Sequence, residues 1–141
     1  DGVDQDWHFY KNGTLAYIIE GTHHNPQSLA TRKASVKTSK PLLSALLDFA
    51  LDAPRVSGRV TDEQNRPLQA TVMVEQVKTY EGERWMSRGI DGRFDRFVPV
   101  IGDYTIQVIK KGYAPQTVTV RAGPLDSTKT ITIRLAAAKR P

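Results

Sequence analysis

The sequence predicts a mostly β protein: an antiparallel β-sandwich, preceded by a strand and a helix that belong to an α/β domain. Three observations support this prediction. After Pro54, short segments of alternating apolar and polar residues recur about every ten residues. Gly, Pro, Asn and Asp separate these segments, and no helical periodicity lies between them. Before Pro54 the chain instead holds one apolar run with a turn, a polar connection and a helix.

The sandwich is predicted to contain seven short strands within about 80 residues, a workable size without disulfides. Alternation is clear in RVSGRVT, which places Val56, Gly58 and Val60 on one face. Asp91-Gly92 is a strong hairpin signal. The predicted strands are 55–61, 70–77, 84–88, 92–98, 104–109, 118–121 and 129–135.

A helix is predicted from Ser39, its N-terminal cap, to Asp52, with Pro41 in the first turn. Its leucines and Phe49 cover more than one face, whereas a surface helix shows a narrower apolar stripe. The run LAYII at 15–19 is likewise predicted to be a buried strand of a parallel or mixed sheet, yet no partner strand is nearby. Both elements require more cover than a small sandwich supplies, and we expect a larger α/β domain to provide it.

Residues 2–25, GVDQDWHFYKNGTLAYIIEGTHHN, resemble the last active-site segment of the zinc metallocarboxypeptidases of the A/B and N/E/D types. In that family a specificity loop leads into an Asp-aromatic pair and a turn, and a buried strand then ends on the catalytic glutamate. The matching residues here are Asp6-Trp7 and Glu20. The step of fourteen residues from Asp6 to Glu20 agrees with the family spacing.

Glycine and aromatic motifs recur in the second part of the chain. They are G-x-V-x-D from Gly58, Gly92-x-Phe94, Gly102-x-Tyr104 and Gly112-Tyr113-x-Pro115. This part resembles the transthyretin-like, regulatory-type domain that follows the catalytic domain in N/E/D-type enzymes. The resemblance divides the chain into residues 1–53, the C-terminal segment of a catalytic domain, and residues 54–141, a transthyretin-like β-sandwich.

The resemblance also implies a chemistry for the whole protein, which is hydrolysis of the C-terminal peptide bond of peptides or proteins by zinc-activated water. Glu20 takes the role of general base. A glutamate at the end of a buried strand suits that role because desolvation raises its pKa, and the alternative is a carboxylate that faces solvent. Gln5 lies where the family places the base of its specificity pocket, and Asp4 can contribute charge nearby. Because Gln5 is neutral and polar, the preferred substrate side chain stays open.

Zinc is the implied cofactor, but its ligands are expected in sequence before Asp1. The family ligands are an H-x-x-E pair and a later His, and His8, His23 and His24 do not supply that pattern. The implied partners are peptide or protein C-termini and the remainder of the catalytic domain. The 141-residue chain alone is therefore predicted to be inactive.

Composition argues against several other classes of protein. The net charge is +5, but the lysines are not interleaved with aromatic residues, so we expect no nucleic-acid partner. No stretch approaches the roughly 18–20 apolar residues of a membrane span. The absence of cysteine excludes disulfides and thiol catalysis. We expect a secreted or periplasmic location. The alternative function is a non-enzymatic transthyretin-like binding domain or cell-surface structural domain.

Overall fold

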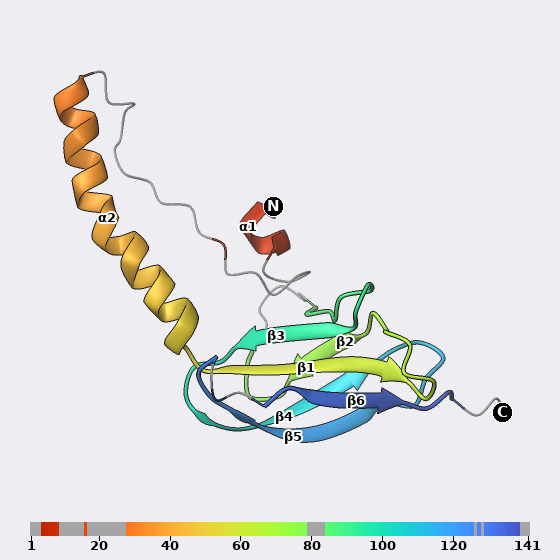
Figure 1. Cartoon of the computed structure of the whole chain (residues 1–141). Helices are drawn as coiled ribbons and strands as arrows, with labels where there is room; N and C mark the ends of the chain where they lie inside the picture. The colour runs from red at the N-terminus through yellow and green to blue at the C-terminus, as the bar shows by residue number, and fades with distance from the viewer. Residues whose placement is uncertain are drawn as a thin grey trace.

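The computed structural model describes residues 4–8, 16, 28–78, 84–125, 127 and 129–138. In this part of the chain a long helix leads into a β-sandwich of two stacked sheets (Figure 1). A short helix, α1 (Asp4–Trp7), precedes them. The long helix, α2 (Leu29–Asp52), projects away from the end of the sandwich at which the first strand begins. None of the described helices is long and apolar enough to cross a membrane.

Each sheet contains three strands among the described residues. The first sheet has the order β3-β1-β6, and the second has the order β2-β4-β5. The strands are β1 (Arg55–Asp62), β2 (Thr71–Val74), β3 (Arg93–Phe97), β4 (Gly102–Ile109), β5 (Gln116–Ala122) and β6 (Ile131–Leu135). The predicted β-sandwich is therefore present, and it is built mainly from antiparallel pairs.

One strand pair contradicts the prediction of a purely antiparallel sandwich. Strands β1 and β6 run parallel, with Gly58 opposite Ile131. The reason is the path of the chain after β5. Gly123 and Arg55 exchange backbone hydrogen bonds of 2.9 and 3.3 Å, so the chain returns to the start of β1 before β6 begins. A connection that returns to the same end of a sheet gives a parallel neighbour.

The predicted strand at 84–88 does not form a regular strand, so the described residues contain six strands rather than seven. The segment pairs with the edge of β2 through an isolated bridge between Thr71 and Met86. Val72 N donates to Trp85 O at 2.8 Å, and Ser87 N donates to Ala70 O at 2.9 Å. These contacts cover the outer edge of β2, which would otherwise present unpaired backbone groups.

The core lies between the two sheets, and the predicted inward face of β1 is confirmed. Val56 and Val60 are fully buried, and Ile106 of β4 lies in the same cluster of buried residues. Gly58 makes room for an aromatic ring in this core. A Cβ atom at position 58 would lie 2.4 Å from Phe94 Cζ, so a side chain there would displace the ring.

Helix α2 is longer than predicted and begins at another cap. Ser28 caps it, because its hydroxyl accepts a hydrogen bond of 3.1 Å from Thr31 N, so the predicted start at Ser39 is wrong. Pro41 lies inside the helix rather than in its first turn. The first half contains good helix formers such as Ala, Lys and Arg. Its surface is exposed, so water can satisfy the carbonyl that Pro41 leaves without a backbone donor.

Candidate functional site

The structure describes only part of the site that the sequence predicts. Asp4 and Gln5 lie in α1, where Asp4 is exposed and its Oδ2 lies 3.6 Å from His8 Nε2. Gln5 is half-buried, and its buried Oε1 accepts no hydrogen bond from a described residue. Glu20 lies outside the described residues, so its predicted place beside Gln5 and Asp4 stays a prediction.

The described residues contain no site for the implied zinc ion. Among them, no group of three or more His, Cys, Asp or Glu side chains could hold a metal ion. His8 is the one histidine that the structure describes, and its ring packs edge-on against Trp7, with centroids 5.0 Å apart. The predicted strand at 15–19 and the histidines at 23 and 24 fall outside the described residues, except for Ala16.

The last turn of α2 is joined to the first sheet by a small cluster of aromatic and arginine side chains. Phe49 of α2 stacks on Phe97 of β3, with ring centroids 5.8 Å apart. The guanidinium of Arg55 lies 4.5 Å from the centroid of the Phe97 ring and donates a hydrogen bond to the carbonyl of Ala50. Leu125 N also donates to Leu51 O at 3.1 Å. The helix therefore has a fixed base on the sandwich.

Above this base, the second half of α2 is rich in leucine and has little cover. It contains no buried residue. Leu43 and Leu47 are 52% and 68% exposed, and Leu42 and Leu51 are also exposed. Large exposed apolar surfaces on monomeric proteins usually mark an interaction site.

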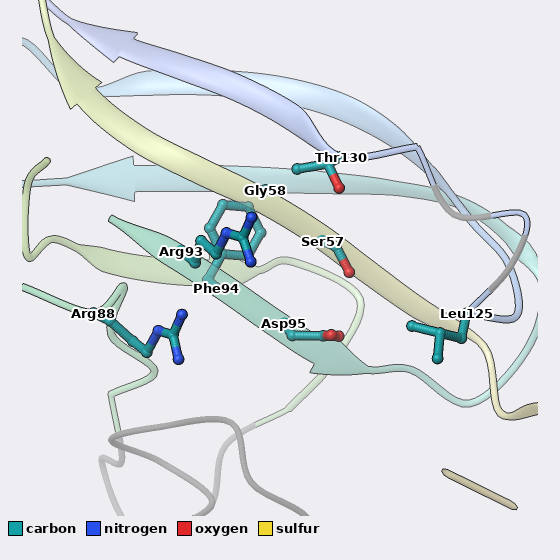
Figure 2. A pocket seen from close by; sticks show the side chains of 8 residues that line it. All are labelled: Ser57, Gly58, Arg88, Arg93, Phe94, Asp95, Leu125 and Thr130. Atoms are coloured by element: carbon teal, nitrogen blue, oxygen red, sulfur yellow. The ribbon is translucent and has the colours of Figure 1, made fainter. Parts of the chain in front are cut away.

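The outer face of the first sheet holds a hollow of about 330 Å³ (Figure 2). Arg88 and Arg93 stand at one end, and Leu125 stands at the other. The carboxylate of Asp95 lies between them, beside the hydroxyl of Ser57. The hollow is also lined by Gly58, Phe94 and Thr130.

Three arginines follow one another across the sheet next to this hollow. Arg59 of β1 is directly opposite Arg93 of β3, and Arg88 N donates to Arg93 O at 2.8 Å. The turn residue Asp91 holds two of the three guanidinium groups. Its carboxylate binds Arg88 through both oxygens, and its backbone carbonyl accepts a hydrogen bond of 2.8 Å from Arg59 Nε. We call Arg59, Arg88 and Arg93 the arginine row.

The charge of Asp91 is favoured by its surroundings. Burial by itself would raise the pKa of Asp91, but hydrogen bonds from the Arg88 side chain and the Arg93 backbone N–H lower it below its usual range. The carboxylate therefore stays ionised and offsets one of the three positive charges in the arginine row.

A fourth arginine lies on the core side of the same sheet. Arg96 is almost completely buried, and its guanidinium lies 5.0 Å from the centroid of the Trp85 ring. Its Nη2 donates to Met86 O at 3.0 Å. Burial lowers the pKa of Arg96 to about 10. These contacts tie the segment at 84–88 to β3.

Sequence reasoning missed the arginine row and the hollow. The alternation that identified inward residues also predicts the opposite set, and Ser57, Arg59, Arg93 and Asp95 all occupy outward positions. What the sequence does not reveal is the strand order, which places Arg59 next to Arg93 and brings Leu125 to the same surface.

The comparisons with known proteins concern the sandwich. One solved structure that matches is described as the structure of the streptococcal ancillary pilin, with 20% identity and a TM-score of 0.41. The match covers 64% of this chain, which spans about a third (31%) of the pilin chain. No curated protein matches the chain. The model of the carboxypeptidase regulatory-like domain family matches residues 55–136, which is more than half of the chain. The chain therefore belongs to the carboxypeptidase regulatory-like domain family.

Proposed function

We propose that the sandwich is a non-catalytic accessory module that holds α2 against a preceding domain of the same protein. The observation that carries this proposal is the contrast within α2. Its last turn is fixed to the sandwich by Phe49 and Arg55, whereas Leu42, Leu43 and Leu47 in the preceding turns are exposed. A helix that is apolar on several sides and fixed at one end can transmit the position of the sandwich to whatever covers it.

The direction of the helix indicates which part of the protein covers it. The first turns of α2 lie far from the sandwich, and only the last turn lies close to it (Figure 1). The family match begins at Arg55, so α2 lies outside the regulatory-like domain. Residues 1–53 resemble the end of a catalytic domain, which supports a preceding domain as the occupant.

Substitutions on α2 test this docking. Leu43→Asp and Leu47→Asp place a charge on the exposed apolar surface without touching the sandwich core. In the product of the complete reading frame, each should lower the melting temperature, because a charge buried without a partner is costly. In the 141-residue chain both should have little effect. Ile90→Asp is the matched control, since Ile90 is 87% exposed on a turn of the sandwich. Equal melting temperatures for all three variants of the complete product would contradict the docking.

A more specific proposal is that the whole protein is a zinc metallocarboxypeptidase. Its support is the spacing of Asp6-Trp7 and Glu20, followed in order by a helix and a regulatory-like domain. In this proposal Glu20 accepts a proton from the attacking water, and Gln5 and Asp4 lie near the substrate side chain. Zinc, when bound, would activate the water, and its ligands would come from residues before Asp1.

Two experiments test the enzyme proposal. The reading frame before the codon for Asp1 should encode an H-x-x-E motif followed by a distant His. Glu20→Gln in the complete product should reduce the release of C-terminal residues by about 10²- to 10⁴-fold. Glu63→Gln, at an exposed turn glutamate, is the control and should retain activity. Undetectable release by the unaltered protein with zinc would contradict the enzyme proposal and leave the docking of α2 in place.

The competing proposal is a non-enzymatic binding or cell-surface structural domain. The family match supports it equally well, because the match covers the sandwich and none of the predicted catalytic residues. Both proposals place the protein outside the cytoplasm, as a secreted or periplasmic protein. Cell fractionation of the source organism tests that location. In the structural alternative, α2 remains exposed and the variants at Leu43 and Leu47 leave the complete product unchanged.

A further inference from the structure

The arginine row is an unfavourable arrangement for stability alone. Arg59 and Arg93 are a directly opposed cross-strand pair of like charge, which destabilises a sheet. Asp91 provides one carboxylate for the three arginines and uses it on Arg88. The side chain of Arg93 forms no hydrogen bond or ion pair with a described residue, and it lines the hollow. The row therefore offers excess positive charge and free N–H donors to an anionic group.

The middle of the hollow carries a carboxylate, that of Asp95, and therefore favours a hydrogen-bond donor rather than an anion. Asp95 Oδ1 is buried and accepts no hydrogen bond from a described residue, while Asp95 Oδ2 lies 3.6 Å from Arg55 Nη1. The Asp95 side chain is nevertheless 42% exposed, so the outer part of its carboxylate can accept a hydrogen bond from a ligand that brings an N–H group. Inorganic phosphate offers mainly acceptor oxygens and would add negative charge beside this carboxylate. A peptide offers both carboxylates and N–H donors.

We propose that the hollow binds the carboxylate-bearing end of a short peptide. The carboxylate is bound by Arg93, with Arg88 beside it, since planar guanidinium groups match carboxylates. A peptide N–H or amino group donates to the exposed part of the Asp95 carboxylate, and an apolar side chain packs against Leu125. The volume of about 330 Å³ lies at the lower end of small-ligand sites, so it suits a few residues.

This site is distinct from the exposed apolar surface of α2, because it uses none of the leucines of the helix. It borders the base of the helix, since Asp95 lies 3.6 Å from Arg55 Nη1 and Leu125 N donates to Leu51 O. It also lies on strands of the sandwich rather than on the segment that resembles a catalytic site. Strand-borne side chains keep a fixed spacing. Arg93 and Asp95 are two residues apart on β3 and therefore project from the same face about 7 Å apart.

Backbone amide chemical shifts of the ¹⁵N-labelled 141-residue chain provide the test. The probe is the tripeptide Leu-Ala-Glu with free termini, which carries an amino group and an apolar side chain at one end and two carboxylates at the other. Titration should shift the amides of Ser57, Arg93 and Asp95. The matched probe Leu-Ala-Gln-amide lacks both carboxylates and should bind at least about tenfold more weakly, since hydrogen bonds to charged groups are the strong ones. Equal binding of the two probes would overturn the proposal.

Two arginine variants test which guanidinium group binds the carboxylate. Arg93→Gln should weaken binding of Leu-Ala-Glu by about tenfold or more. Arg121→Gln removes the same charge from the second sheet, where Arg121 is exposed and lies 3.3 Å from Asp103, and should change binding by less than about threefold. Equal weakening by the two substitutions would show a general charge effect and overturn the site.

Inorganic phosphate, titrated at matched ionic strength, distinguishes a peptide site from a simple anion site. Phosphate should cause smaller shifts at Asp95 and bind more weakly than Leu-Ala-Glu. Asp95→Asn should weaken binding of the tripeptide and not of phosphate, because the substitution removes the negative charge that binds the amino group. Phosphate binding as tight as that of the tripeptide, with the same shifts, would overturn the peptide assignment.

Discussion

The sandwich and helix α2 are both rich in apolar residues, but only the sandwich buries them. Val56, Val60 and Ile106 are fully buried between the two sheets. Helix α2 contains leucines along its second half and has no buried residue. The difference lies in pairing: every strand has a hydrogen-bonded neighbour and an opposite sheet, whereas α2 contacts the sandwich through its last turn. Apolar composition therefore predicts a need for cover, and the topology decides whether that cover is local.

The contrast is tested most strongly by removing one apolar side chain from each region. Ile106→Ala should lower the free energy of unfolding by about 2–5 kcal/mol, because it leaves a cavity in the core. Leu47→Ala in the same 141-residue chain should change it by less than about 0.5 kcal/mol. Urea unfolding measures both. Similar losses for the two variants would mean that α2 is packed in solution.

A substitution at the base of the helix should have an intermediate effect on the free energy of unfolding. Arg55→Gln removes the contact with Phe97 and the hydrogen bond to Ala50 O, and we expect a loss of about 1–3 kcal/mol. Arg121→Gln is the control, since exposed ion pairs contribute at most about 1 kcal/mol. If the two arginine variants unfold at the same urea concentration, Arg55 does not anchor the helix.

The contact between Phe49 and Phe97 should contribute less to stability than the contacts of Arg55. Phe49→Ala removes the stacked pair, and we expect the interaction with Phe97 to contribute about 0.5–1.5 kcal/mol. A double-mutant cycle with Phe97→Ala isolates this pairwise interaction from the loss of buried area. A coupling energy indistinguishable from zero would mean that the helix base is held by Arg55 and the backbone alone.

The smallest effect concerns the pH dependence of the sandwich. Burial by itself would raise the pKa of Asp62, but hydrogen bonds from the Arg66 side chain and from the backbone N–H groups of Arg66 and Gln64 lower it below its usual value. The stabilisation by Asp62 is therefore complete above the pKa of the unfolded chain, about 3.9, and is lost as the pH falls through the lower folded value.

Unfolding of the unaltered chain and of Asp62→Asn between about pH 5 and pH 2 measures this loss. The free energy of unfolding should fall less steeply with decreasing pH in the variant. Asp103→Asn, at an exposed carboxylate of the second sheet, is the control. Parallel pH profiles for the unaltered chain and Asp62→Asn would contradict the assigned hydrogen bonds.

The sequence predicted what depends on local patterns and missed what depends on the path of the chain. Val56, Gly58 and Val60 follow strict alternation, so their inward face was predictable. The parallel pairing of β6 was not, because it depends on the return of the chain through Gly123 to Arg55. Pro41 suits a first turn and so favours a helix start at Ser39, although exposure also allows proline inside α2.

The candidate sites also divide into residues that sequence patterns identify and residues that only the strand order brings together. Resemblance identified Glu20, Gln5 and Asp4, whose roles remain predictions, with Glu20 outside the described residues. The arginine row required the strand order, since Arg59 and Arg93 are far apart in the sequence and become neighbours only through the pairing of β1 with β3. A pattern along one strand gives the face of a side chain and not its neighbours across the sheet.

Hydrogen exchange of the backbone amides of α2 shows whether a preceding domain covers the apolar surface of the helix. In the 141-residue chain we expect slow exchange in β1 and β4 and fast exchange in the first turns of α2. In the product of the complete reading frame, exchange in α2 should slow by at least about tenfold, while β4 stays unchanged. Equal exchange rates for α2 in the two proteins would contradict the proposal that a preceding domain covers the helix.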